Sequence, residues 1–239
     1  MAATTLRGGK ARMTSTSLDP AAPTLTPPTA STTAPPTPAT YGVGARITLC
    51  PMTDRYVDVI LGALADVTPD AAVEDVLTTS TSPVSTYIGG GEHAVVRRLV
   101  DLVTAAARCA DGAHLSAHIL LSRGCPGEVA CEPHSGPWAS TDTLAVPDAG
   151  VRAWAEWSLY PLLDGAGGGE HMAPIMAAID EAKASGLFHS ADHYVTRLAG
   201  DVGAILALVG GAWLRTGAVV QHVTTHLTLS INSPTEVPK

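Results

Sequence analysis

The 239-residue sequence lacks the short motifs that mark common enzyme classes. It contains no Gly-x-Ser-x-Gly elbow, no Walker phosphate loop and no His-Glu-x-x-His metal helix. Gly89, Gly90 and Gly91 precede an expected helix, but the Lys and the Ser or Thr of a phosphate loop do not follow them. These absences favour a binding protein over an enzyme, and no cofactor is expected.

Long apolar runs and an excess of positive charge are also lacking. The longest apolar run, Val202 to Leu214, has 13 residues, fewer than the roughly 20 that cross a bilayer, so no membrane span is expected. Lys and Arg total 14 against 22 Asp and Glu, and the net charge of −8 argues against a nucleic-acid partner and favours a neutral or cationic ligand. No apolar run of signal-peptide length follows the basic residues near the N-terminus, so the cytoplasm is the expected location.

Metal-binding patterns are missing as well. The sequence has four cysteines, and the Cys-x5-Cys spacing of Cys125 and Cys131 does not form a zinc knuckle, so reduced thiols are expected. His114 and His118 would share one face of a strand, but about 13 Å would separate them at the strand rise, too far for one metal ion. No metal site is predicted.

What the sequence does contain is a tandem repeat. The stretch HLSAHILLSRGCP, His114 to Pro126, returns 108 positions later as HVTTHLTLSINSP, His222 to Pro234, without a gap. Both copies alternate apolar and polar residues with a period of two, which is typical of a half-buried strand. The pairing places His118 with His226 and Ser122 with Ser230 on the polar face, which a sheet covered by helices on one side leaves uncovered.

Each half of the chain shows the same order of elements: strand, helix, a hairpin of two strands, helix, strand. This order predicts an α+β fold of two ferredoxin-like (βαββαβ) repeats, with ACT-like antiparallel sheets and helices on one face. The first repeat is expected over 41–128, a connection containing Trp138 over 129–150, and the second repeat over 151–239. The Pro/Thr/Ala-rich residues 1–40 are expected to be a disordered tail, because they cannot bury enough apolar surface.

The first helix of each repeat carries a helical stripe of large apolar residues. The residues at the spacing of one buried face are Val57, Ile60, Leu61 and Leu64 in the first repeat and Met172, Ile175, Met176 and Ile179 in the second. We expect these stripes to face the core. Thr53 or Asp54 is the expected N-cap of the first of these helices.

Five segments together resemble one known family. ARITLCPMTDRYVDVILGAL, VSTYIGGGEHAVVRRLVDLV and HILLSRGCPGE in the first half, and WSLYPLLD and HLTLSINSP in the second, resemble the YkoF family of thiamine- and hydroxymethylpyrimidine-binding proteins. The resemblance covers about 45–236. It implies two ferredoxin-like domains, a homodimer, and non-catalytic binding of thiamine or its hydroxymethylpyrimidine precursor in each repeat, in support of precursor uptake or salvage and with a functional link to a transporter.

An aminopyrimidine presents ring-nitrogen acceptors beside an amino donor, so its pocket needs hydroxyl or carboxyl partners and an apolar wall. Comparison of the repeats supplies such groups. The ligand-binding candidates are Asp54, Ser82, Thr86, Tyr87, His118, Ser122, Asp164, Asp192, Thr196, His226 and Ser230. The positive charge of Arg197, at the position of Tyr87, is expected to disfavour a thiazolium cation in the second repeat, so that the two sites bind unequally.

Other interpretations of these residues stay open. Asp54 and Asp164 could cap the helices that follow them, the threonines could reflect strand propensity alone, and the face with His118 could be solvated or packed on another sheet. A small-molecule enzyme with His118 as its base and an ACT-like regulatory module are the alternative functions.

Overall fold

The elements of the chain follow the predicted order in both repeats. The computed structural model describes residues 37–38, 40–67, 77–125, 127, 138–140, 144–162 and 171–235. The first repeat comprises β1 (Gly44–Pro51), α1 (Tyr56–Asp66), β2 (Thr78–Thr81), β3 (Thr86–Gly89), α2 (Glu92–Cys109) and β4 (Leu115–Arg123). The second comprises β5 (Arg152–Leu162), α3 (Met172–Ser185), β6 (Phe188–Asp192), β7 (Val195–Asp201), α4 (Val202–Gly217) and β8 (His222–Ile231). The expected tail over 1–40 lies almost wholly outside the described residues.

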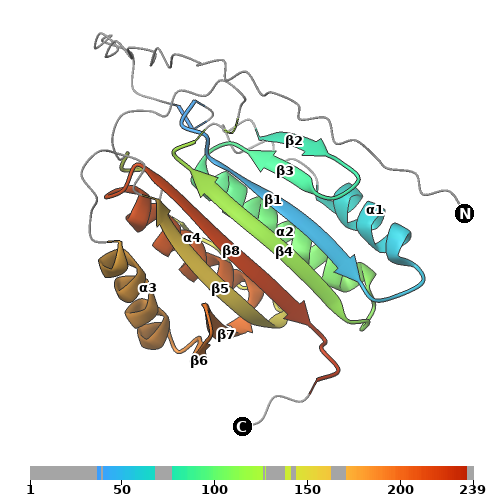
Figure 1. The fold of residues 1–239 in the computed structure, drawn as a ribbon. Coiled ribbons are helices and arrows are strands. Elements are labelled where there is room, and N and C mark those ends of the chain that lie inside the picture. Colours follow the sequence, from blue (N-terminus) through green and yellow to red (C-terminus); the bar gives the residue numbers. More distant parts are fainter. Residues whose placement is uncertain are drawn as a thin grey trace, which may run out of the picture. The chain divides into compact units, whose positions relative to one another are not determined.

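The two repeats share one antiparallel sheet of eight strands. Its order is β2-β3-β1-β4-β8-β5-β7-β6, so the final strands β4 and β8 pair at the centre (Figure 1). In that pair Ile119 lies opposite Leu227, its own counterpart 108 residues later. This register relates the repeats by a pseudo-two-fold axis at the Ile119–Leu227 pair. The α+β fold of tandem ferredoxin-like repeats is therefore confirmed, and the sequence did not reveal that the sheets join.

The helices cover one face of the sheet, and no described element covers the other, which we call the uncovered face (Figure 1). The alternation has the predicted phase: Ala117, Ile119 and Leu121 of β4 are buried, whereas His118 and Leu120 are exposed. The inward side chains of the four long strands pack against α2 and α4 in a single core. None of the described helices has both the length and the hydrophobicity needed to cross a membrane.

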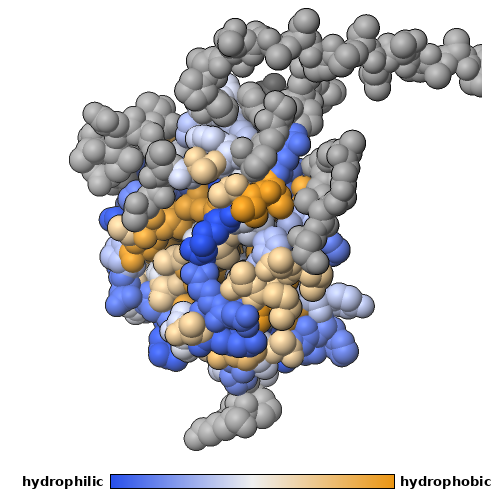
Figure 2. Space-filling view, turned by 90° about the vertical axis from the view of Figure 1, so that its left-hand side faces the viewer, coloured by the Kyte–Doolittle hydropathy of each residue, from blue (hydrophilic) through white to orange (hydrophobic). Residues whose placement is uncertain are grey.

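The predicted burial of the apolar stripes of α1 and α3 is confirmed only in part. Half of the stripe residues are half-buried, namely Ile60, Leu64, Ile175 and Ile179, and Leu64 packs against the core, whereas the other half are exposed. Val57 and Leu61 are 47% and 60% exposed, and the buried residues of α1 are Val59 and Ala63. Likewise α3 buries Ala178 and Ala182 and leaves Met172 and Met176 exposed. Small side chains on the inward face let a peripheral helix approach the sheet closely. The side of the molecule at α3 accordingly shows hydrophobic surface between hydrophilic patches (Figure 2).

A buried arginine joins the two repeats at the end of β4. The Arg123 side chain is fully buried, and its guanidinium lies 3.4 Å from the Glu92 carboxylate of α2. It donates to the carbonyls of Trp138, at 2.6 Å, and Leu214, at 3.2 Å. Its guanidinium carbon also lies 5.3 Å from the centre of the Trp138 ring and 5.4 Å from that of Tyr41. Arg123 therefore ties α2, α4 and the connection together, and Trp138 packs on the fold as predicted.

A second polar contact fixes the end of the connection to α4. The carboxylate of Asp201 accepts hydrogen bonds from the backbone N–H groups of Gly203 and Ala204, which cap α4, and from those of Ala149 and Val151. Burial would raise the pKa of Asp201, but the four N–H donors outweigh it and hold the pKa below the usual range.

Candidate functional site

The predicted ligand-binding residues lie on both sides of the sheet. The residues on the uncovered face are Tyr87, His118, Ser122, Asp192, His226 and Ser230. Thr86 and Thr196 lie on the opposite, helix-covered side, next to Ile47 and Trp157 on the neighbouring strands. Asp54 and Ser82 are exposed near one end of the first repeat, and Asp164 lies outside the described residues. One pocket per repeat therefore cannot contain all of them.

The middle hairpin of each repeat is held by an equivalent hydrogen bond. Thr48 on β1 donates to the carbonyl of Val84 at 3.0 Å, and Ser158 on β5 donates to that of Tyr194 at 2.8 Å. Each donor is 110 residues from its counterpart, and so is each acceptor. These bonds place the hairpin turns beside the carboxyl halves of β1 and β5, the strands from which the chain runs to Asp54 and Asp164.

Thr86 and Thr196 follow these turns and are each 7% exposed. Their hydroxyl environments differ. The Thr86 hydroxyl lies 3.1 Å from that of Thr81, whereas the residue opposite Thr196 is Ala191, which has no hydroxyl. The Thr196 hydroxyl forms no hydrogen bond with any residue in the described ranges. The two repeats thus present similar but unequal polar groups at their strand ends.

Asp54 does not cap α1. The N-cap of this helix is Arg55, with no hydrogen bond from its side chain, so the predicted cap at Thr53 or Asp54 is wrong. The reason is a tight turn in which the N–H of Tyr56 bonds to the carbonyl of Thr53, which starts the helix after Arg55. The exposed Asp54 carboxylate makes no hydrogen bond or ion pair with the described part of the chain. Capping therefore does not account for this carboxylate.

Ser82 has a local role at the β2–β3 turn. Its hydroxyl donates to the carbonyl of Ser85 at 3.1 Å and accepts a hydrogen bond from the N–H of Ser85 at 3.2 Å, which closes the turn.

Asp192 forms an ion pair in the second repeat, because its carboxylate lies 2.7 Å from the Arg197 guanidinium. Arg197 also pairs with Glu156 at 3.3 Å. Its charge is offset by two carboxylates and it lies on the opposite face from Thr196, so the expected repulsion of a thiazolium by Arg197 loses its basis.

The uncovered face carries paired histidines and hydroxyls related by the pseudo-two-fold axis. Nε2 of His114 lies 2.9 Å from Oγ of Ser230, and Nε2 of His222 lies 3.3 Å from Oγ of Ser122. Each predicted serine therefore contacts a histidine of the other repeat across the β4–β8 pair. Near the centre, Nδ1 of His118 lies 3.3 Å from the hydroxyl of Thr228. In the residues that the structure describes, no three His, Cys, Asp or Glu are grouped to hold a metal ion.

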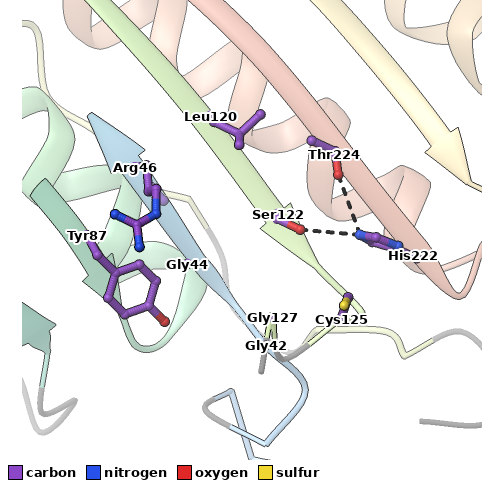
Figure 3. A pocket seen from close by; sticks show the side chains of 11 residues that line it. Gly42, Gly44, Arg46, Tyr87, Leu120, Ser122, Cys125, Gly127, His222 and Thr224 are labelled. Carbon is purple, nitrogen blue, oxygen red and sulfur yellow. Dashed lines mark hydrogen bonds between the residues drawn. The ribbon is translucent and has the colours of Figure 1, made fainter. Parts of the chain in front are cut away.

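A cavity of about 510 Å³ opens on the uncovered face of the first repeat (Figure 3). It brings together the predicted residues Tyr87 and Ser122 with Arg46, His222 and Thr224, which were not among the predicted ligand-binding residues. The sequence carried a signal for this set, since all five have the phase of the uncovered face. It did not indicate that Tyr87 and Ser122, on different strands, would line one hollow.

Two comparisons with known proteins bear on the chain. The model of the family described as "YKOF-related Family" matches residues 42–128 and 152–236. The chain is also 30% identical over 201 residues to a Bacillus subtilis (strain 168) protein named "Putative HMP/thiamine-binding protein YkoF", an alignment that covers 80% of this chain and 90% of that protein.

Proposed function

Because the chain belongs to the YKOF-related family, we propose that it binds thiamine or its hydroxymethylpyrimidine precursor in each repeat and does not turn it over. The name of the Bacillus subtilis relative, which describes an HMP/thiamine-binding protein, supports this ligand class. The proposed role is the uptake or salvage of the precursor, in functional association with a transporter.

We also propose that the protein acts as a homodimer in the cytoplasm, and light scattering of the purified protein tests that assembly.

The strand ends are the proposed binding sites. Two equivalent hydrogen bonds support this placement, one from Thr48 to the Val84 carbonyl and one from Ser158 to the Tyr194 carbonyl. Because each bond fixes the hairpin turn of its repeat, Thr86 and Thr196 occupy equivalent positions just after the turns. A threonine hydroxyl can donate to a pyrimidine ring nitrogen and accept from its amino group, and a carboxylate can accept from that amino group or offset a thiazolium charge. Asp54 and Asp164 are the proposed carboxylates.

Unequal affinity of the two sites now has a different basis. The Thr86 hydroxyl lies beside Thr81, whereas the Thr196 hydroxyl faces Ala191. A hydroxyl that already has a protein partner must give it up on binding a ligand, whereas a hydroxyl without one in the described residues gives up only water. We therefore propose that the hydroxyl of Thr196 contributes more to binding than that of Thr86.

Replacing Asp54 by asparagine is expected to weaken one of the two thiamine sites by about ten- to a hundredfold, because a charged hydrogen-bond partner contributes about 1.5 to 3 kcal/mol. The melting temperature should stay the same, since the side chain does not cap α1. Calorimetric titration with thiamine measures both sites in one experiment. Asp58→Asn, an exposed acid in the first turn of the same helix, is the matched control and should bind as the parent does. Unchanged affinity in Asp54→Asn would exclude this carboxylate from the site.

A further inference from the structure

The described residues that line the cavity on the uncovered face carry positive charge and no negative charge. None of its eleven lining residues is Asp or Glu, although acids outnumber bases in the chain. On one wall, Arg46 lies with its guanidinium carbon 5.6 Å from the centre of the Tyr87 ring and donates to the Ser85 hydroxyl at 3.1 Å. Within the described ranges, Arg46 forms no ion pair. Its charge is thus available to a ligand.

The opposite wall supplies hydrogen-bonding groups. Nε2 of His222 lies 3.3 Å from the Ser122 hydroxyl and 3.5 Å from that of Thr224. Leu120, 41% exposed, adds an apolar surface between the two walls. Arg46 and Tyr87 on one side and Ser122, Thr224 and His222 on the other border the same hollow (Figure 3).

A glycine creates this hollow. Gly44 lies opposite Ser122, and the residue opposite Ser230 in the second repeat is Trp154. A Cβ at Gly44 would lie 2.9 Å from the Tyr87 ring, and one at Gly89 would lie 2.4 Å from the Tyr87 hydroxyl. The Tyr87 ring therefore rests across two glycines, where any other residue would displace it.

The second repeat fills the same place with side chains. Trp154 packs edge-on against His189, with ring centres 4.8 Å apart. Arg197 stands where the first repeat has Tyr87, and it pairs with Glu156, which stands where the first repeat has Arg46. The first repeat thus has an open, positively charged cavity at a position that the second repeat closes and neutralises.

We propose that this cavity is a separate binding site for a small compound that joins a flat ring to an anionic group, a carboxylate or a phosphate. The guanidinium of an arginine matches both anions with two parallel hydrogen bonds. The ring would stack on Tyr87, and Ser122, Thr224 and His222 would bind polar substituents. A volume of about 510 Å³ is within the usual range for small-molecule sites. The same positive charge opposes a thiamine cation, so this site assigns Tyr87 and Ser122 to a different ligand class.

Calorimetric titration of the full chain with four probes tests the proposal. Phenyl phosphate and benzoate should bind at one molecule per chain, and the tighter of the two identifies the preferred anion. Inorganic phosphate, which lacks the ring, should bind about tenfold more weakly, because an aromatic contact contributes about 1 kcal/mol. Benzylamine, with the opposite charge, should not bind. Binding of neither ring anion at millimolar concentration would overturn the proposal, as would binding of benzylamine with equal affinity.

Substitution at Arg46 locates the site. Arg46→Gln should lower the affinity for the preferred ring anion at least tenfold. Arg46→Lys keeps the positive charge but loses the two parallel hydrogen bonds of a guanidinium, so it should lower the affinity less. Arg152→Gln, which removes another exposed arginine of the sheet, is the matched control and should bind as the parent does. Thiamine affinity should be the same in all of these variants, so this test is independent of the strand-end sites. Ring-anion affinity that is unchanged in Arg46→Gln would overturn the proposal.

Discussion

Replacing Arg123 by methionine is expected to lower the free energy of unfolding by about 3 to 5 kcal/mol, because it breaks a buried ion pair by removing one of the two charges. Both side chains are at most 1% exposed, so water cannot replace the lost contact. The substitution also removes the hydrogen bonds to the Trp138 and Leu214 carbonyls, which join the connection to α4. Burial lowers the pKa of Arg123 and the Glu92 charge opposes that effect, which shows the cost of burying this cation.

Urea denaturation followed by circular dichroism measures the effect. The double variant Arg123→Met with Glu92→Gln should recover part of the loss, since no uncompensated charge remains in the core. Arg97→Met, which breaks an exposed pair with Asp101, is the control and should cost less than about 1 kcal/mol. A loss of less than 1 kcal/mol in Arg123→Met would contradict the central position of this residue.

Removing the Asp201 side chain is expected to cause the second large loss of stability. Asp201→Ala should cost about 2 to 3 kcal/mol at neutral pH, because four backbone N–H groups lose a charged acceptor and two of them begin α4. Asp201→Ser should recover the part due to the helix cap, since serine caps well but does not reach the connection. Asp148→Ala, at an exposed neighbouring residue, is the control and should leave the stability unchanged. Equal losses in the alanine and serine variants would show that the carboxylate holds only the connection.

The contribution of Asp201 should depend on pH in a defined direction. Its pKa is lower in the folded protein than in the unfolded chain. The stabilisation is therefore complete above the unfolded pKa of about 4 and is lost as the pH falls through the folded pKa. The difference in stability between the parent and Asp201→Ala, measured by urea denaturation from pH 7 to pH 3, should be constant above about pH 5 and should shrink below it. A difference that grows on acidification would contradict this assignment.

The fold was predictable because its signals are periodic and occur twice. Alternation along β4 and β8 identified which side of each strand is buried, and the 108-residue offset identified the repeat. The motif resemblance to the YkoF family is confirmed by the family match over both repeats. The alternation along β4 also predicts that the Arg123 side chain points toward the core, because Arg123 lies on the same side of the strand as Ala117, Ile119 and Leu121. A charged side chain, however, is ordinarily expected at the surface.

The remaining features depend on contacts between distant residues. The cavity exists because Gly44 stands where the other repeat has Trp154, and this difference has meaning only once the strands are in register. The burial of α1 and α3 was misjudged in part, because the size of Val57 or Met176 suggested a core position, whereas close packing selected Ala63 and Ala178. The cap of α1 depended on a turn at Thr53 that residue preferences alone do not fix.

Calorimetric titration of the purified protein with thiamine and with hydroxymethylpyrimidine tests the central claim most directly. The account predicts two binding events per chain with different affinities, and chromatography of the ligand after incubation should recover it unchanged. Absence of binding for both compounds would contradict the proposed function, and recovery of a chemically altered ligand would contradict its non-catalytic character.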